Sequence, residues 1–117
     1  MISLLDVNTY ASMVKDYLAK EDKGKCAELV PAIESKLADR KEVLNNLQAK
    51  AELLESDSAW NRYESADEAY GYGEQLKELL DNFVNDLEEW EDVEWQIDDI
   101  ISSTRKEFNY RLERAQW

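Results

Sequence analysis

The sequence predicts an all-α protein, an elongated antiparallel helical bundle with two long heptad-patterned helices and two shorter ones. Apolar residues recur at steps of three and four along most of the chain, which is typical of amphipathic helices. The chain has only three glycines and one proline, too few for a turn-rich β-sandwich or barrel. Its 44% hydrophobic content, with four tryptophans and six tyrosines, is enough to bury a core. At 117 residues we expect one domain, residues 1–117.

The first helix is expected from about Asp6 to Glu21. Residues at helical spacing form a single apolar stripe along it. These are Tyr10, Met13, Val14, Tyr17 and Leu18. The Lys-Gly-Lys sequence at 23–25 predicts its end, because Gly24 can adopt the left-handed conformation that closes many helices.

The second helix is expected to begin near Cys26 or Val30, which places Pro31 in the first turn, where its missing N–H costs nothing. An earlier start would put Pro31 inside the helix and predicts a kink there. Seven of the eight residues on its seam are apolar. They are Val30, Ile33, Leu37, Arg40, Leu44, Leu47, Ala51 and Leu54. Residues 55–58 then read as a turn, with Asp57 or Ser58 capping the next helix.

A short third helix is expected to carry Trp60, Tyr63 and Tyr70 and to break at Gly71 and Gly73. Each glycine weakens a helix by roughly 1 kcal/mol relative to alanine. The helix face on which the apolar residues fall, or apolar phase, also changes across the two glycines, which favours a real interruption of the helix.

A second heptad seam follows Gly73, and nine of its twelve positions are apolar. They are Leu76, Leu80, Phe83, Leu87, Trp90, Glu94, Ile97, Ile101, Thr104, Phe108, Arg111 and Ala115. Because a turn normally resets the phase, we expect one continuous helix from about Glu74 to Gln116. The alternative is a capping box formed by Asp86 and Glu89, which would start a separate helix there.

Charge is divided very unevenly along the chain. The formal net charge is −13, from 27 acidic and 14 basic residues. Residues 1–50 carry eight acids and eight bases, whereas residues 78–99 carry ten carboxylates and no base. Ordinary soluble surfaces interleave the two signs, and like charges three or four positions apart destabilise a helix. This acidic stretch is therefore the most informative feature of the sequence.

As one helix, residues 78–99 would span about 33 Å, with a carboxylate every 3.3 Å or so. A strand of duplex DNA carries a phosphate about every 3.4 Å. The stretch therefore predicts a mimic of nucleic-acid charge, with no direct binding of nucleic acid and a basic, nucleic-acid-binding protein as the partner. The expected partner-binding residues are Glu78, Asp81, Glu88, Glu91, Asp92, Trp95, Asp98 and Asp99. Of the nearby tryptophans, Trp95 is expected to be partly exposed and to anchor the partner, and Trp90 to pack in the core.

Composition limits the catalytic chemistry available to the chain. It has no histidine and one cysteine, which removes imidazole catalysis, Cys/His zinc sites and intrachain disulfides. Lys23 and Lys25 could lower the pKa of Cys26, but a lone cysteine at a helix edge is usually a packing residue. We therefore expect a non-catalytic protein without cofactors.

Two pairs of carboxylates leave an enzymatic alternative open. Glu52 and Glu55, then Glu78 and Asp81, are each spaced three apart, so each pair could offer oxygen ligands to a hard cation. This spacing resembles that of the all-α nucleotide pyrophosphohydrolases, in which two such pairs on neighbouring helices hold Mg²⁺. The resemblance covers these four residues, and it implies Mg²⁺-dependent nucleotide hydrolysis.

In size and charge, the chain is similar to the DNA-mimicking inhibitors of phage anti-restriction and anti-CRISPR type. That resemblance implies a viral inhibitor that blocks a nucleic-acid-binding site, and it transfers no residue roles. A structural or assembly role as a helical oligomer, including a homodimer, is the other open alternative. With a single cysteine and no apolar run longer than three residues, we expect a cytoplasmic protein without a membrane span.

Overall fold

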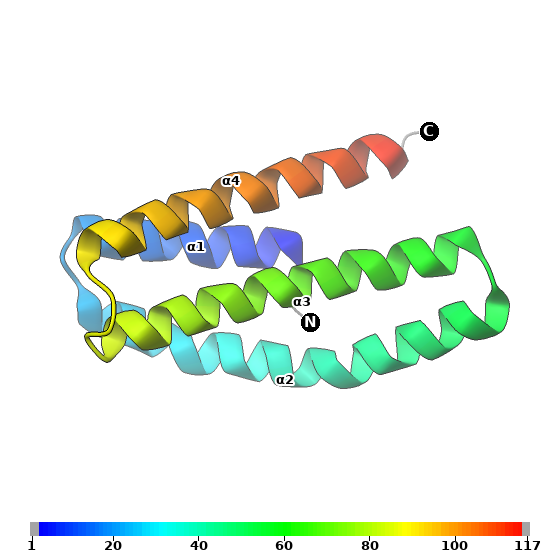
Figure 1. Ribbon diagram of the computed structural model, residues 1–117, viewed down its shortest axis with the longest axis horizontal. Helices are drawn as coiled ribbons and strands as arrows, with labels where there is room; N and C mark the ends of the chain where they lie inside the picture. The colour runs from blue at the N-terminus through cyan, green and yellow to red at the C-terminus, as the bar shows by residue number, and fades with distance from the viewer. Residues whose placement is uncertain (1–2, 116–117) are drawn as a thin grey trace.

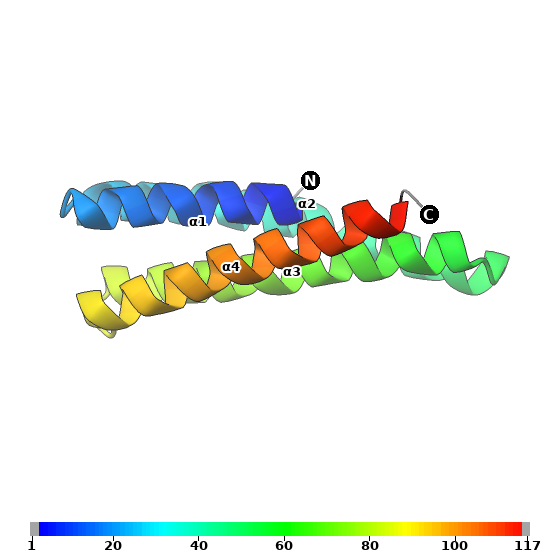
Figure 2. The same ribbon diagram turned by 90° about the horizontal axis from the view of Figure 1, so that it is seen from above.

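Four α-helices form an antiparallel bundle, which confirms the all-α fold class (Figure 1). The computed structural model describes residues 3–115, without the side chains of residues 40 and 112–115. The helices are α1 (Leu4–Ala19), α2 (Lys23–Leu54), α3 (Asp57–Val84) and α4 (Trp90–Ala115). The Cα atoms extend over 48 × 28 × 17 Å, so the bundle is elongated as predicted. In Figure 2, α1 and α2 form one layer, and α3 and α4 form the other.

The four helices overlap along only part of the bundle. In Figure 1, α1 begins near the middle of the long axis, whereas α2 and α3 continue to the turn that joins them at the far end. The turns between α1 and α2 and between α3 and α4 lie together at the opposite end. The main hydrophobic core therefore lies in the half of the molecule where all four helices are present.

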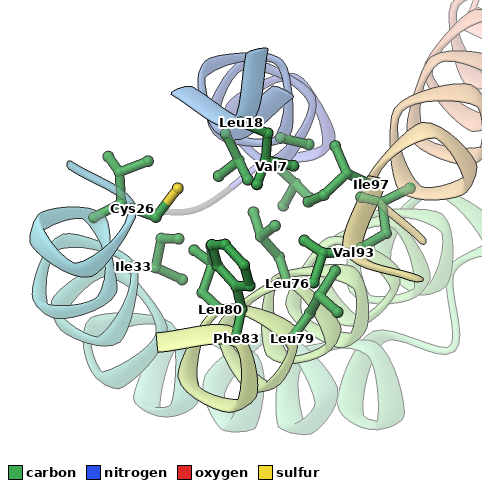
Figure 3. Packing of buried hydrophobic residues seen from close by; sticks show 14 of the residues in the cluster. Val7, Leu18, Cys26, Ile33, Leu76, Leu79, Leu80, Phe83, Val93 and Ile97 are labelled. Carbon is green, nitrogen blue, oxygen red and sulfur yellow. The ribbon is translucent and has the colours of Figure 1, made fainter. Parts of the chain in front are cut away.

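This core receives buried side chains from every helix (Figure 3). Val7, Ile33, Leu76 and Ile97 are fully buried and point toward one another from α1, α2, α3 and α4. Burial of each such side chain contributes about 1.5–3 kcal/mol. The rest of the cluster comprises Ala11, Val14, Leu18, Cys26, Leu29, Leu37, Leu79, Leu80, Phe83, Val93 and Ile100.

One polar contact ties α1 to α4 beside this core. The Asn8 side-chain amide donates to the Ile101 carbonyl at 2.9 Å and to the Thr104 hydroxyl oxygen at 3.0 Å. The Thr104 hydroxyl, which is fully buried, donates to the Ile100 carbonyl at 2.7 Å. Because a buried hydroxyl without partners costs free energy, this arrangement favours one alignment of α1 along α4.

The start of α1 is fixed by a capping box that the sequence analysis missed. The Ser3 hydroxyl accepts from the Asp6 N–H at 3.1 Å, and the Asp6 carboxylate accepts from the Ser3 N–H at 3.0 Å. The prediction that Gly24 ends this helix in the left-handed conformation is wrong, because Gly24 lies inside α2. Glu21 takes that conformation instead, with φ of 55°.

The second helix begins earlier than predicted, at Lys23, because the Asp22 carboxylate caps it by accepting from the Lys25 N–H at 3.1 Å. Pro31 therefore lies within α2, which continues past it without interruption. Pro31 is exposed, so solvent can hydrate the backbone carbonyl that loses its helical donor there. The predicted turn at 55–58 is shorter in the structure, at residues 55 and 56. The predicted caps Asp57 and Ser58 are wrong, because both lie inside α3 and Ser56 caps it.

The predicted break at Gly71 and Gly73 is wrong, because α3 runs through both glycines. Two glycines cost about 2 kcal/mol in helix propensity, less than α3 gains by burying its apolar side. That side includes Leu76, Leu80 and Phe83, each at most 1% exposed. Tertiary packing therefore overrides the local weakness.

The prediction of one helix from Glu74 to Gln116 is also wrong, and its end lies outside the described residues. The chain turns at residues 85–89, near the alternative break predicted at Asp86. Asp86 has φ of 61°, and the Leu87 N–H donates to the Asn82 carbonyl at 2.7 Å. The apolar phase does not reset because Trp90, seven positions after Phe83, packs edge-to-face on it with ring centroids 4.8 Å apart.

A charged cluster joins α3 to α4 away from this turn. The Arg111 guanidinium donates to the Glu68 carboxylate at 2.8 and 3.2 Å. Partial burial and the neighbouring Glu68 raise the pKa of Glu107, although Arg111 and Lys106 oppose the shift. Because this pKa is raised on folding, Glu107 supports the fold while protonated and loses that contribution as pH rises through its folded pKa.

Replacing Glu107 with glutamine should therefore stabilise the protein at neutral pH. We expect E107Q to raise the free energy of unfolding at pH 7 by about 0.5 kcal/mol, the usual size of a partly exposed like-charge contact. The gain should disappear below about pH 4, where glutamates are protonated in both states. Urea unfolding at both pH values measures this, with E64Q on the exposed side of α3 as control. Equal stability of E107Q and the wild type at pH 7 would contradict it.

Leu80 and Leu53 provide a direct test of the core. Leu80 is fully buried and Leu53 is 83% exposed. We expect L80A to lower the free energy of unfolding by about 2–5 kcal/mol through lost burial and the remaining cavity. L53A should change it by less than about 0.5 kcal/mol. Chemical denaturation followed by circular dichroism measures both, and similar losses in the two variants would show that the core is placed incorrectly.

Candidate protein-interaction surface

The turn between α3 and α4 folds the acidic stretch back on itself. Residues 78–84 form the end of α3, residues 85–89 form the turn, and residues 90–99 form the start of α4. All ten carboxylates therefore lie within about 15 Å of the turn along the helix axes. We call this region the acidic end. It comprises Glu78, Asp81, Asp86, Glu88, Glu89, Glu91, Asp92, Glu94, Asp98 and Asp99.

This folding corrects the predicted geometry of the nucleic-acid mimic. A single straight row of charges matching one DNA strand over a full turn does not form, because the two helix ends lie antiparallel (Figure 1). The carboxylates are nevertheless gathered at one end of the bundle instead of being scattered over it. The local density of negative charge is therefore higher than in the extended helix.

Two lysines from the α1 side neutralise part of the acidic end. The Lys15 ammonium lies 2.7 Å from the Asp98 carboxylate, and Lys23 pairs with Asp86. Among the described residues, the other eight carboxylates of the acidic end form no ion pair. Arg111, a basic residue close to this stretch in sequence, binds Glu68 instead. The acidic end thus keeps most of its charge available to a partner.

Four of the predicted partner-binding residues meet in one groove between α3 and α4. Its volume is about 390 Å³. Glu78, Glu88, Trp95 and Asp99 line it, together with Gln75, Leu79, Asn82, Gln96 and Ile100. Leu79 and Ile100 are almost fully buried, so the groove combines an apolar base with three carboxylates. We refer to it as the α3–α4 groove.

The two tryptophans of this region have different roles in the structure. Trp95 is 72% exposed at the α3–α4 groove, as predicted for an anchor residue. Trp90 is 38% exposed because one side of its ring packs against Phe83. Trp90 therefore supports the turn, whereas Trp95 offers a large aromatic surface to solvent.

The other four predicted residues lie outside the α3–α4 groove. Asp81 lines a wider groove of about 770 Å³ between α2 and α3, where Lys41 and Lys77 offset part of the negative charge. Glu91 and Asp92 are exposed in the first turn of α4, where negative charge also stabilises the helix dipole. Asp98 faces α1 through its ion pair with Lys15. The structure therefore divides the predicted set between several surfaces.

Several residues of the α3–α4 groove escaped the sequence analysis. Gln75, Asn82 and Gln96 are neutral, and no charge pattern or motif marks them. The pairing of Lys15 and Lys23 with distant carboxylates was also missed, because it depends on how α1 and α2 sit beside α4 and the turn. These contacts required knowledge of the tertiary packing.

The structure separates the two carboxylate pairs of the enzymatic alternative. Glu52 and Glu55 lie at the turn between α2 and α3, whereas Glu78 and Asp81 lie near the other end of α3. About 22 residues of helix, or roughly 33 Å, lie between them. The two pairs therefore cannot share a cation in this monomer, and the described residues contain no cluster of three carboxylate or cysteine side chains suited to a metal.

Cys26 is a packing residue in this structure. It is fully buried in the core, and this burial, together with the nearby Asp22 carboxylate, raises the pKa of its thiol. The expectation that Lys23 and Lys25 could lower that pKa is therefore wrong. A raised pKa reduces the thiolate population and with it the reactivity of the cysteine.

Comparisons with known proteins leave the family of the chain open. Within the described residues, no helix is both long enough and apolar enough to cross a membrane. No protein family matches the chain, and no curated protein or solved structure is significantly similar to it.

Proposed function

We propose that this chain is a non-catalytic inhibitor whose acidic end occupies a basic, nucleic-acid-binding site on a partner protein. The observation that carries this proposal is the gathering at one end of the bundle of eight carboxylates that form no ion pair with any described residue, three of which line a groove with the exposed Trp95. Crowding like charges costs folding free energy, and a binding role accounts for that cost. The analogy with phage anti-defence proteins belongs to this proposal as well.

Electrostatic attraction explains how such a surface would find its partner. A strongly negative region steers a positively charged site toward it, and this effect weakens with salt because the Debye length is about 10 Å at 0.1 M. Once in contact, the arginines and lysines of that site would pair with Glu78, Glu88 and Asp99. Trp95 would stack on an arginine or fill an apolar pocket.

The rigidity of the bundle supports the same proposal. Val93 and Ile97 anchor α4 in the core on the side opposite Trp95. Except for Glu88 in the turn, the groove side chains project from two helices that share this core, so binding orders little additional backbone. Interfaces that are organised in advance lose less conformational entropy on binding.

Reversing the charge of the groove should abolish binding without unfolding the protein. We expect the triple variant E78K/E88K/D99K to bind at least about 100-fold more weakly, because like charges then face the partner. Its stability should be equal to or above that of the wild type, because repulsion within the acidic end is relieved. Immobilised wild type and variant are compared in nuclease-treated cell lysate at low and high salt, and the retained proteins are identified by mass spectrometry.

The matched control carries three reversals on the exposed side of α2, D39K/E42K/E52K. It changes the net charge equally but should retain the partner. The captured protein should bind nucleic acid when purified, and a short DNA duplex should displace it from the acidic end. Equal retention by the groove variant, or no competition from the duplex, would contradict the proposal.

Trp95 should contribute to affinity but little to stability. We expect W95A to weaken binding of the captured partner about tenfold or more, as for an aromatic anchor. W95F should retain much of the affinity. Because Trp95 is 72% exposed, its removal should change the free energy of unfolding by less than about 0.5 kcal/mol. Titration calorimetry and urea unfolding measure the two effects, and unchanged affinity in W95A would exclude an anchoring role.

A further inference from the structure

The apolar pattern of α3 continues into α4 across the turn between them. Every seventh residue from Ala69 to Thr104 is at most 1% exposed, except Trp90 beside the turn. These positions are Ala69, Leu76, Phe83, Trp90, Ile97 and Thr104. A helix running straight through residues 85–89 would therefore keep one apolar stripe on one side.

The turn at residues 85–89 lacks the two residues that most strongly interrupt a helix. Its sequence, Asn-Asp-Leu-Glu-Glu, contains neither glycine nor proline. Asp86 takes the left-handed conformation, with φ of 61°, which aspartate tolerates better than most residues but less well than glycine. Leu87 is 73% exposed there, whereas leucine and glutamate favour helices. Straightening the turn into a helix would remove the strain at Asp86.

The contacts that hold α4 come largely from α1. Asn8 binds Ile101 and Thr104, and Lys15 pairs with Asp98. None of these contacts requires α1 and α4 to belong to the same chain. A second copy offers the same surface on its own α1 and α3, so an exchanged α4 would recover all of them.

We propose that the chain forms a domain-swapped dimer in which the turn at 85–89 straightens, α3 and α4 become one helix, and α4 packs into a second copy. In Figure 1, α3 runs toward the turn and α4 runs back from it. If α3 continued straight on, α4 would leave the bundle at this end. It would then enter a second bundle placed end to end with the first. There it would run antiparallel to α3 of the second copy, as it does to α3 of its own chain in the monomer. The exchange is reciprocal, so the dimer closes with two-fold symmetry.

The acidic end opposes this exchange. In the swapped dimer, Glu88, Glu89, Glu91 and Asp92 of both chains would meet near the two-fold axis. Their repulsion is screened by salt, so the dimer should be favoured at high ionic strength, the reverse of the salt dependence expected for a basic partner. The proposal is independent of the inhibitor function, since an exchanged α4 would form the same α3–α4 groove with α3 of the second copy.

Two substitutions at Asp86 test the mechanism as a matched pair. Both D86A and D86G lose the ion pair with Lys23, so they differ by a methyl group alone. Alanine disfavours the left-handed turn and favours the helix, whereas glycine does the opposite. We expect the dimerisation constant of D86A to exceed that of D86G at least tenfold. Light scattering during gel filtration measures it at several protein concentrations in low and high salt.

A distance measurement separates exchange from simple association. Spin labels at K50C and N109C in a C26A background lie on the same side of the turn in the monomer, offset by about 10 Å along the axis. In a swapped dimer they lie on opposite sides, about 70 Å apart along it. The doubly labelled D86A chain is diluted into excess unlabelled D86A chain, and the distance within one chain is measured by pulsed electron resonance.

A concentration-dependent dimer with the long distance would establish the exchange. Two results would overturn it. One is a D86A variant that remains monomeric at millimolar concentration in high salt. The other is a dimer that keeps the short distance, which would show that copies associate without exchanging α4.

Discussion

The structure depends on one apolar core that lies beside its most highly charged region. Val93 and Ile97 of α4 meet Leu80 and Phe83 of α3 there, and α1 and α2 close the other side. Repulsion between the carboxylates at the surface would otherwise drive α3 and α4 apart. Hydrophobic burial is not screened and does not depend on the sign of charge, so it can hold like charges close together. The acidic end therefore exists because the core beneath it is strong enough to maintain it.

The partial neutralisation of this region follows from the same packing. The α1–α2 turn lies at the acidic end of the bundle, and Lys15 of α1 and Lys23 at the start of α2 reach Asp98 and Asp86 on either side of it. These pairs lie on the side of α4 and of the turn that faces α1. The α3–α4 groove lies between α4 and α3 instead, and no lysine lines it. A stretch that is uniformly acidic in sequence therefore presents two different surfaces in the fold. One pairs with lysines of the bundle, and the other keeps its negative charge.

The turn at residues 85–89 connects the proposed inhibitor function with the proposed exchange of α4. When the turn is closed, it brings Glu78 and Asp99 into one groove beside Trp95. If it were straightened, Glu78 and Asp99 of one chain would be about 31 Å apart along a single helix. In the exchanged dimer, Glu78 of one chain would instead face Trp95 and Asp99 of the second copy, so the groove would form between two chains and binding of a basic partner would not require the closed turn.

The sequence by itself determined the helical class, most of the apolar seam positions and the position of the acidic stretch, because these depend on local periodicity and on counting charges. Leu54 and Leu87, which were expected on the seams, are 55% and 73% exposed because they lie at a helix end and in a turn. The sequence also identified Trp95 as exposed, from its place one residue beside the seam. The breaks between helices depended on tertiary structure. Gly71 and Gly73 remain helical because α3 buries Leu76 and Phe83, and the turn at Asp86 is invisible to periodicity because Trp90 stays against Phe83 across it. Tertiary packing likewise decided which carboxylates form ion pairs. Lys15 is 83 positions from Asp98 in the chain, and no local sequence pattern encodes a contact at that separation.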